Sequence, residues 1–146
     1  MPMLHSQSDA AVVRMLEQVP MFSSLSNKQI RGLANGAKER DYAEGALVVK
    51  QGEPGVGFYL VLDGKVEVRR RGRSLASLGP GQFFGEMSLL DQEPRTADVV
   101  ATKPTRCLIL SKWEFWGFAM GEPKVLRTIL EEMARRLRDT NRALSE

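Results

Sequence analysis

The hydrophobic positions of the chain follow two different periods. Apolar residues recur at helical spacing near both ends, whereas the middle carries short alternating runs separated by turn residues, which is typical of antiparallel strands. The pattern therefore predicts a mainly β domain with flanking helices (α+β). We divide it into a disordered tail at 1–8 and a single domain at 9–146, with N-terminal helices at 9–37, an antiparallel β-roll or jelly roll at 38–110, and C-terminal helices at 112–121 and 123–145.

Two short amphipathic helices are expected before the β region. The first should end before Pro20, because the residue that precedes a proline disfavours helical geometry. Ser26 can cap the second, whose apolar residues share one face and which should close near Gly36.

Six runs in the middle of the chain are the best candidates for strands. Asp63-Gly64 lies between two of them and gives the strongest hairpin signal, since a type I′ turn needs positive φ at both central residues. Six to eight short strands in about 70 residues must bury two faces, so a small jelly roll is the economical architecture. The runs are 46–50, 57–62, 65–70, 74–78, 97–101 and 106–110.

The last helix is expected to follow a hinge at Gly121-Glu122-Pro123, because proline suits the first position of a helix. Its apolar residues form a heptad-like stripe. We expect this stripe to pack against its own domain, and a homodimer through the same helix stays open, since fewer than three heptads are a weak coiled-coil signal. The stripe consists of Leu126, Leu130, Met133, Leu137 and Leu144.

Composition narrows the classes of function. The 146 residues are 42% hydrophobic and 27% charged, which fits one globular domain, and the net charge of +3 permits weak attraction to polyanions without demanding nucleic acid. The sequence has no run of about 18 apolar residues, so no membrane span is predicted. The start of the chain lacks the pattern of a signal peptide, so we expect a cytoplasmic protein.

The chain has one histidine and one cysteine, which argues against metal and triad chemistry. His5 lies in the expected tail, and Cys107 lies in an apolar run where a buried small hydrophobe is favoured over a reactive thiol. No clear pair of acid and base carboxylates is present. We therefore expect a protein without a metal site or catalytic residues, which is not an enzyme. The alternative of a jelly-roll enzyme of the cupin type would need several histidine ligands.

The stretch 79–97 breaks the apolar period with residues that bend or bind. Gly85 lets the backbone come close to a ligand, the turn at 85–88 offers backbone N–H groups, and Arg95 offers a guanidinium fork. These are the groups that bind a phosphate. The stretch therefore predicts an anion-binding site.

Two motifs resemble the cyclic-nucleotide-binding domain family. One is 84–90 (Phe-Gly-Glu-Met-Ser-Leu-Leu) followed by 94–97 (Pro-Arg-Thr-Ala), which is similar to the family's phosphate-binding cassette; the other is 51–55 (Gln-Gly-Glu-Pro-Gly) followed by 58–61 and Gly64. The likeness covers about residues 15–140, and Val56 departs from the aspartate that many members carry. The resemblance implies a β-roll whose ligand site contains Gly85, Glu86, Met87, Ser88, Arg95 and Thr96.

Under this resemblance each polar group has an expected role. An ionised carboxylate only accepts hydrogen bonds, so Glu86 would bind the ribose 2′-hydroxyl, while Arg95 would bind the phosphate and steady Glu86. The resemblance adds the backbone amides of Gly85, Met87 and Ser88 and the hydroxyl of Thr96. That hydroxyl can serve cyclic AMP or a syn guanine in cyclic GMP, and we favour cyclic AMP.

Base contacts or a lid over the base are expected from Phe84, Trp116, Leu130 and Met133. Core packing is nevertheless the main expectation for most of the aromatic and apolar residues near the site. These are Phe83, Phe84, Met87, Leu89 and Leu90 in the cassette, and Trp113, Trp116 and Phe118 after it.

These inferences predict a non-catalytic cyclic-nucleotide sensor whose C-terminal helix moves when ligand binds, acting on a partner protein or on an effector domain outside this chain. Two alternatives stay open. One is a fragment of a transcription regulator that contacts nucleic acid through arginines 69–71 with Arg73 and 135–136 with Arg138, although solvated faces explain these charges better. The other is a degenerate β-roll that mediates interactions without a ligand.

Overall fold

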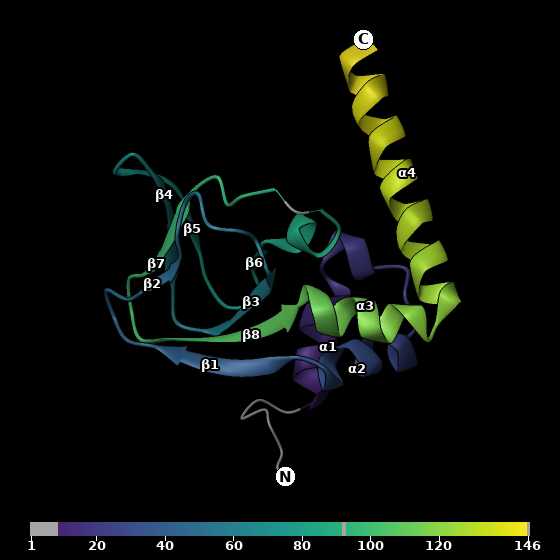
Figure 1. Cartoon of the computed structure of the whole chain (residues 1–146), viewed down its shortest axis with the longest axis horizontal. Helices are drawn as coiled ribbons and strands as arrows, with labels where there is room; N and C mark the ends of the chain where they lie inside the picture. Colours follow the sequence, from purple (N-terminus) through teal and green to yellow (C-terminus); the bar gives the residue numbers. More distant parts are fainter. Residues whose placement is uncertain (1–8, 92, 146) are drawn as a thin grey trace.

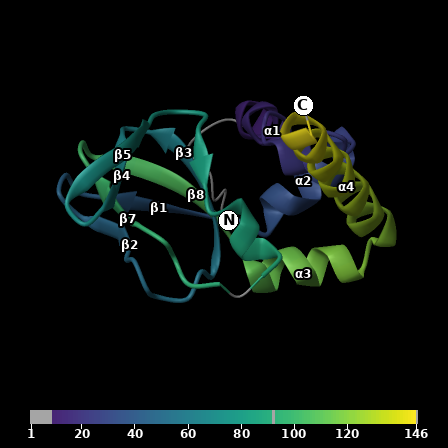
Figure 2. The same ribbon diagram turned by 90° about the horizontal axis from the view of Figure 1, so that it is seen from above.

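Two antiparallel sheets of four strands each face one another, and helices gather at one end of them (Figures 1 and 2). The computed structural model describes residues 9–91 and 93–145, so the expected tail at 1–8, with His5, lies outside the described residues. The elements in chain order are α1 (Asp9–Glu17), η1 (Pro20–Phe22), α2 (Asn27–Asn35), β1 (Lys38–Tyr42), β2 (Leu47–Val49), β3 (Gly57–Asp63), β4 (Val66–Arg70), β5 (Arg73–Leu78), β6 (Phe83–Phe84), η2 (Glu86–Leu89), β7 (Asp98–Ala101), β8 (Thr105–Ser111), α3 (Lys112–Met120) and α4 (Pro123–Ser145).

All six predicted strands are present, and β1 and β6 are two further strands that the sequence analysis did not single out. The first sheet has the order β1-β8-β3-β6 and the second has the order β2-β7-β4-β5. The predicted mainly β domain with flanking helices is therefore confirmed.

The predicted hairpin at Asp63-Gly64 is wrong. β3 and β4, which this turn joins, belong to different sheets, and of the two residues only Gly64 has a positive φ, at 95°. The two-residue hairpin lies instead between β4 and β5, where Arg71 and Gly72 have φ of 53° and 77° and the flanking Arg70 and Arg73 are paired. Asp63-Gly64 turns the chain from one sheet into the other.

Strand β3, in the interior of the first sheet, is buried on both faces, which explains its continuous apolar run. Alternate side chains of a strand point to opposite faces. Phe58 and Leu60 enter a core with the helices, whereas Tyr59 and Val61 enter a second core between the sheets. Cys107 also lies in the second core, where burial raises the pKa of its thiol to about 12, as expected for an inert small hydrophobe.

The N-terminal helices close the helical core against the first sheet. Ser26 caps α2 in the predicted way, because its side chain accepts from the Gln29 amide while Gln29 reaches back to the Ser26 amide. Phe22 in η1 meets Phe58 edge to face, with ring centroids 5.5 Å apart. These contacts fix the helices to the strand that carries the middle of the roll.

The stripe predicted on α4 is only partly correct. The buried residues of this helix are Val125, Ile129 and Glu132, which follow one another at helical spacing and pack on η1 and α3. Leu130 and Leu137 are 67% and 62% exposed, so their expected packing on the domain is wrong. The second half of α4 projects away from the helices (Figure 1), and none of the helices in the described ranges is long and apolar enough to cross a membrane.

Candidate functional site

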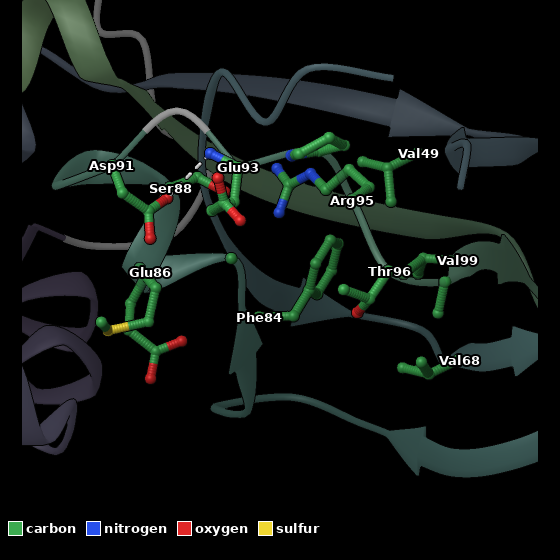
Figure 3. A pocket seen from close by; sticks show the side chains of 14 residues that line it. Val49, Val68, Phe84, Glu86, Ser88, Asp91, Glu93, Arg95, Thr96 and Val99 are labelled. Carbon is green, nitrogen blue, oxygen red and sulfur yellow. Dashed lines mark hydrogen bonds between the residues drawn. The ribbon is translucent and has the colours of Figure 1, made fainter. Parts of the chain in front are cut away.

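A cavity of about 300 Å³ lies at one end of the roll, between the η2 turn and the inner faces of β2, β4 and β7 (Figure 3). Its polar wall comes from two stretches of chain, the turn 84–88 and the residues 91 and 93–97. All six residues predicted to bind ligand line this cavity. They are Gly85, Glu86, Met87, Ser88, Arg95 and Thr96.

Gly85 allows two parts of the site to meet. Its φ of 82° is in the left-handed region that favours glycine. A Cβ at this position would lie 2.5 Å from Arg95 Nη1 and 2.7 Å from the Gly57 oxygen. The missing side chain therefore lets the guanidinium lie directly against the start of the η2 turn.

Gly55 makes a similar close approach from the loop before β3. A Cβ there would lie 2.3 Å from Ser88 Oγ and 3.5 Å from Arg95 Nε. Ser88 is 8% exposed, and its amide donates to the Gly85 oxygen at 3.0 Å. That amide is engaged within η2, contrary to the expectation that it faces the ligand.

Arg95 is half-buried and carries the positive charge of the cavity. Its Nη2 donates to the Gly57 oxygen at 2.8 Å, and its guanidinium carbon lies 5.6 Å from the centre of the Tyr59 ring. Burial lowers the pKa of Arg95, and Tyr59 offsets this in part. Since arginine titrates far above neutral pH, the group remains a cation that is poorly hydrated and ready to bind an anion.

Glu86 opens the η2 turn and is partly exposed in the cavity wall. Across the described residues no ion pair joins it to Arg95, and in Figure 3 the guanidinium extends toward the side where Ser88 and Glu93 lie. The expectation that Arg95 steadies Glu86 is therefore not met. Binding of a ribose hydroxyl by Glu86 stays a prediction.

Thr96 is exposed at the rim of the cavity, next to Arg95. Its backbone oxygen accepts from Arg70 Nε at 3.0 Å, which ties the loop to the end of β4. Thr96 and Arg95 thus both line the cavity, and binding of one anionic group by the Thr96 hydroxyl and the guanidinium together stays a prediction.

Sequence reasoning missed the apolar wall and two further carboxylates. Val49, Val68 and Val99 form the side of the cavity that belongs to the second sheet, and Asp91 and Glu93 line its other edge. The period of two in the strands was a usable signal, because Val68 shares a face with the buried Val66 and Val99 shares one with the buried Ala101. Asp91 also accepts from the Glu93 amide at 3.2 Å, as the dashed line in Figure 3 shows.

The residues expected over the base are not brought together. Phe84 lines the cavity and stacks on Tyr59 with ring centroids 4.8 Å apart, but Trp116, Leu130 and Met133 are not among the lining residues. Trp116 Nε1 instead donates to the Leu89 oxygen at the end of η2, at 2.7 Å. A lid role for these three residues stays a prediction.

Three packing expectations near the site are wrong. Trp113 is 68% exposed, Met87 is 50% exposed and Trp116 is 37% exposed, so none of them belongs to the core. Leu89 is fully buried, and Phe83, Leu90 and Phe118 pack against the helical core as expected. Within the residues that the structure describes, no group of three or more His, Cys, Asp or Glu side chains is placed to hold a metal ion.

The sequence pattern of one protein family, described as the cyclic nucleotide-binding domain, matches residues 39–121. The chain belongs to this family. This cyclic nucleotide-binding domain shares 35% identity over 127 residues with the cyclic AMP receptor protein of Thermus thermophilus, covering 84% of the chain and 59% of that relative. It shares 30% identity over 136 residues with a CRP-like cAMP-activated global transcriptional regulator of Mycobacterium tuberculosis, covering 90% and 61%.

Among solved structures, the domain is similar to the N-terminal domain of a transcriptional regulator from Streptomyces coelicolor. The TM-score is 0.83 at 35% identity, with 89% of this chain and 94% of that one covered. The chain spans about three-fifths of the length of the two curated relatives, which places the match in one part of those proteins.

Proposed function

We propose that this domain binds a cyclic purine nucleotide, with cyclic AMP preferred over cyclic GMP, as a non-catalytic sensor. One observation carries the proposal: residues from two separate stretches line a single cavity around the half-buried cation of Arg95. A cavity of about 300 Å³ is at the lower end of the range for small-molecule sites, which suits a mononucleotide.

The preference for cyclic AMP rests on the relatives rather than on the geometry. Both curated relatives carry cyclic AMP in their names. Thr96, at the rim, has a hydroxyl that can serve either nucleotide. Titration with both nucleotides therefore has to measure the preference directly.

Movement of α4 is the proposed output. Trp116 connects α3 to the end of η2 through its hydrogen bond to Leu89, and α3 in turn packs on the start of α4. A ligand shifts a conformational equilibrium only through contacts that differ between the two states. A change in the η2 turn would reach α4 along this path. The movement of α4 would then act on a partner protein or on an effector domain of a longer chain.

The second candidate is the sensor part of a transcription regulator. The chain spans about three-fifths of the two curated regulators that it resembles, and nucleic-acid contact would then be made by the remaining part of such a protein. Leu130 and Leu137 lie seven residues apart and exposed on α4, which favours a homodimer through this helix. Sedimentation of the chain and of Leu137→Glu tests this dimer, which the substitution should weaken.

Calorimetric titration with cyclic AMP and cyclic GMP tests the proposed function. We expect saturable binding near one nucleotide per chain, weakened by about 2–5 kcal/mol in Arg95→Ala because a buried charged partner is lost. Arg31→Ala, at an exposed position on α2, is the matched control and should bind like the original chain. Absence of heat with either nucleotide, or equal binding by Arg95→Ala, would contradict the proposal and favour an interaction module without ligand.

A further inference from the structure

The Arg95 guanidinium is held in place by two neutral groups. Its hydrogen bond goes to the Gly57 oxygen, and its planar face lies near the ring of Tyr59. Neither group neutralises the positive charge. A carboxylate would also position the guanidinium, but it would compete with an anionic ligand for the same N–H donors.

Tyr59 is itself rigidly fixed. It lies on β3, is 8% exposed, and stands opposite Phe84 of β6 in the strand pairing. The two rings stack 4.8 Å apart with an angle of 8° between their planes. Tyr59 therefore offers Arg95 a surface that cannot turn away, which lowers the entropy cost of holding a long side chain in one geometry.

We propose that Tyr59 is a positioning residue for ligand binding, whose ring holds the Arg95 guanidinium where a cyclic phosphate can bind it. This inference rests on the proposed function. Cations near the face of an aromatic ring are attracted by its quadrupole, and this attraction needs the ring but not the hydroxyl. Burial, the main influence, raises the pKa of Tyr59, so the phenol remains neutral near pH 7.

A second cavity, of about 100 Å³, is bordered by Arg95 and Tyr59, and its wall also carries Glu53 and Lys50. Loss of the Tyr59 ring would enlarge it and let the guanidinium turn toward the Glu53 carboxylate. Such a pairing would move the positive charge out of the ligand cavity. The Tyr59 ring would therefore also prevent Arg95 from pairing with Glu53.

The chain provides a matched control in Tyr42. This tyrosine is also 8% exposed, belongs to the same core between the sheets, and has its own cation, Arg40, 5.3 Å from the ring centre. Tyr42→Leu and Tyr59→Leu thus remove similar buried rings from one core, but only Tyr59 contacts Arg95. Their urea midpoints should fall by similar amounts.

Calorimetric titration with cyclic AMP separates positioning from packing. We expect Tyr59→Leu to weaken binding about tenfold, the range of a partly desolvated cation–π contact, and Tyr59→Phe to recover most of the affinity. Tyr42→Leu should stay within about threefold of the original chain. Equal weakening by the two leucine variants would overturn the proposal, because it would assign the effect to lost packing.

A double-mutant cycle gives a second test. In an Arg95→Ala background, Tyr59→Leu should have no further effect on affinity, since its action passes through the guanidinium. Additive losses would overturn the proposal.

A measurement without ligand keeps this inference distinguishable from the proposed function. The NMR signals of the Arg95 side chain should carry a ring-current shift that Tyr59→Phe retains and Tyr59→Leu abolishes. If the original chain binds no cyclic nucleotide, the proposed function fails, and with it the role in binding. Unchanged Arg95 signals in Tyr59→Leu would overturn the positioning itself.

Discussion

Two arginines of this domain, one on the outer surface and one in the cavity, are held in opposite ways. Arg106 lies on β8 opposite Asp41 of β1, and its Nε donates to Asp41 Oδ1 at 2.7 Å, with Glu39 Oε1 3.7 Å away. The bond to Asp41 raises the pKa of Arg106, and the pKa of Asp41 is correspondingly lowered. This is a surface charge paired with opposite charges.

Arg95 is a half-buried cation without such compensation. It bonds a backbone oxygen, lies over a neutral ring, and loses hydration, which lowers its pKa. The difference separates a charge that is paired within the fold from a charge that our proposal assigns to a ligand. A cation that is positioned but not neutralised contributes little to folding and is available to an anion.

The largest effect is expected from closing the space beside Arg95. Gly85→Ala would place a methyl group 2.5 Å from Arg95 Nη1 at a backbone φ of 82°, so both strain and displacement of the guanidinium follow. We expect binding of cyclic AMP to weaken by about 100-fold or more. The unfolding free energy should fall by about 1–3 kcal/mol. Calorimetry and urea denaturation measure the two quantities.

Gly81→Ala is the control for backbone strain. Gly81 has a φ of 86°, and a Cβ there would meet nothing within 4 Å. It should lose similar stability but keep its affinity for the nucleotide. If both alanine variants lost affinity equally, the cause would be strain near β6, and the contact between Gly85 and Arg95 would lose its special role.

An intermediate effect is expected from removing each positive charge in turn. Arg95→Met should leave the unfolding free energy within about 1 kcal/mol of the original chain, or raise it, because an uncompensated charge is replaced by a flexible apolar side chain. Arg106→Met should instead lower the urea midpoint slightly, since two carboxylates lose their partner.

Binding of cyclic AMP should follow the reverse order, weakened in Arg95→Met and retained in Arg106→Met. A large loss of stability in Arg95→Met would contradict the comparison, because Arg95 would then be a structural residue. Urea denaturation without nucleotide decides this point.

The shared position of the six expected ligand residues at one cavity could be predicted because their chemistry is local in sequence, while their binding of a nucleotide stays a prediction. The turn at 84–88 and Arg95 with Thr96 are two short motifs. Packing alone gives little reason for a glycine, a carboxylate and a guanidinium at these positions. The support behind Arg95 could not be predicted. Gly57 and Tyr59 are 38 and 36 positions before Arg95, and their contact depends on how β3 is paired.

The wrong predictions share one cause, which is that a local pattern does not specify the partner of an element. Asp63-Gly64 has ideal hairpin chemistry, yet the strands on either side join different sheets. Trp113 falls in an apolar helix but on the face that nothing covers. The period of α4 indicated a stripe, whereas the position of η1 and α3 decided that Val125 and Ile129 rather than Leu130 are buried.

The smallest effect concerns pH and the Arg106 pair. The pKa of Asp41 is lowered in the folded state, mainly by its hydrogen bond from Arg106, so the pair stabilises the fold above the ordinary carboxyl pKa of about 3.9. This contribution is lost as pH falls through the lower, folded-state pKa. Asp41→Asn should therefore have a lower urea midpoint than the original chain at pH 7, and the difference should shrink in acid. If the difference in urea midpoint stayed constant with pH, Asp41 would act without its charge. The contrast between Arg106 and Arg95 could then no longer be attributed to pairing with a carboxylate.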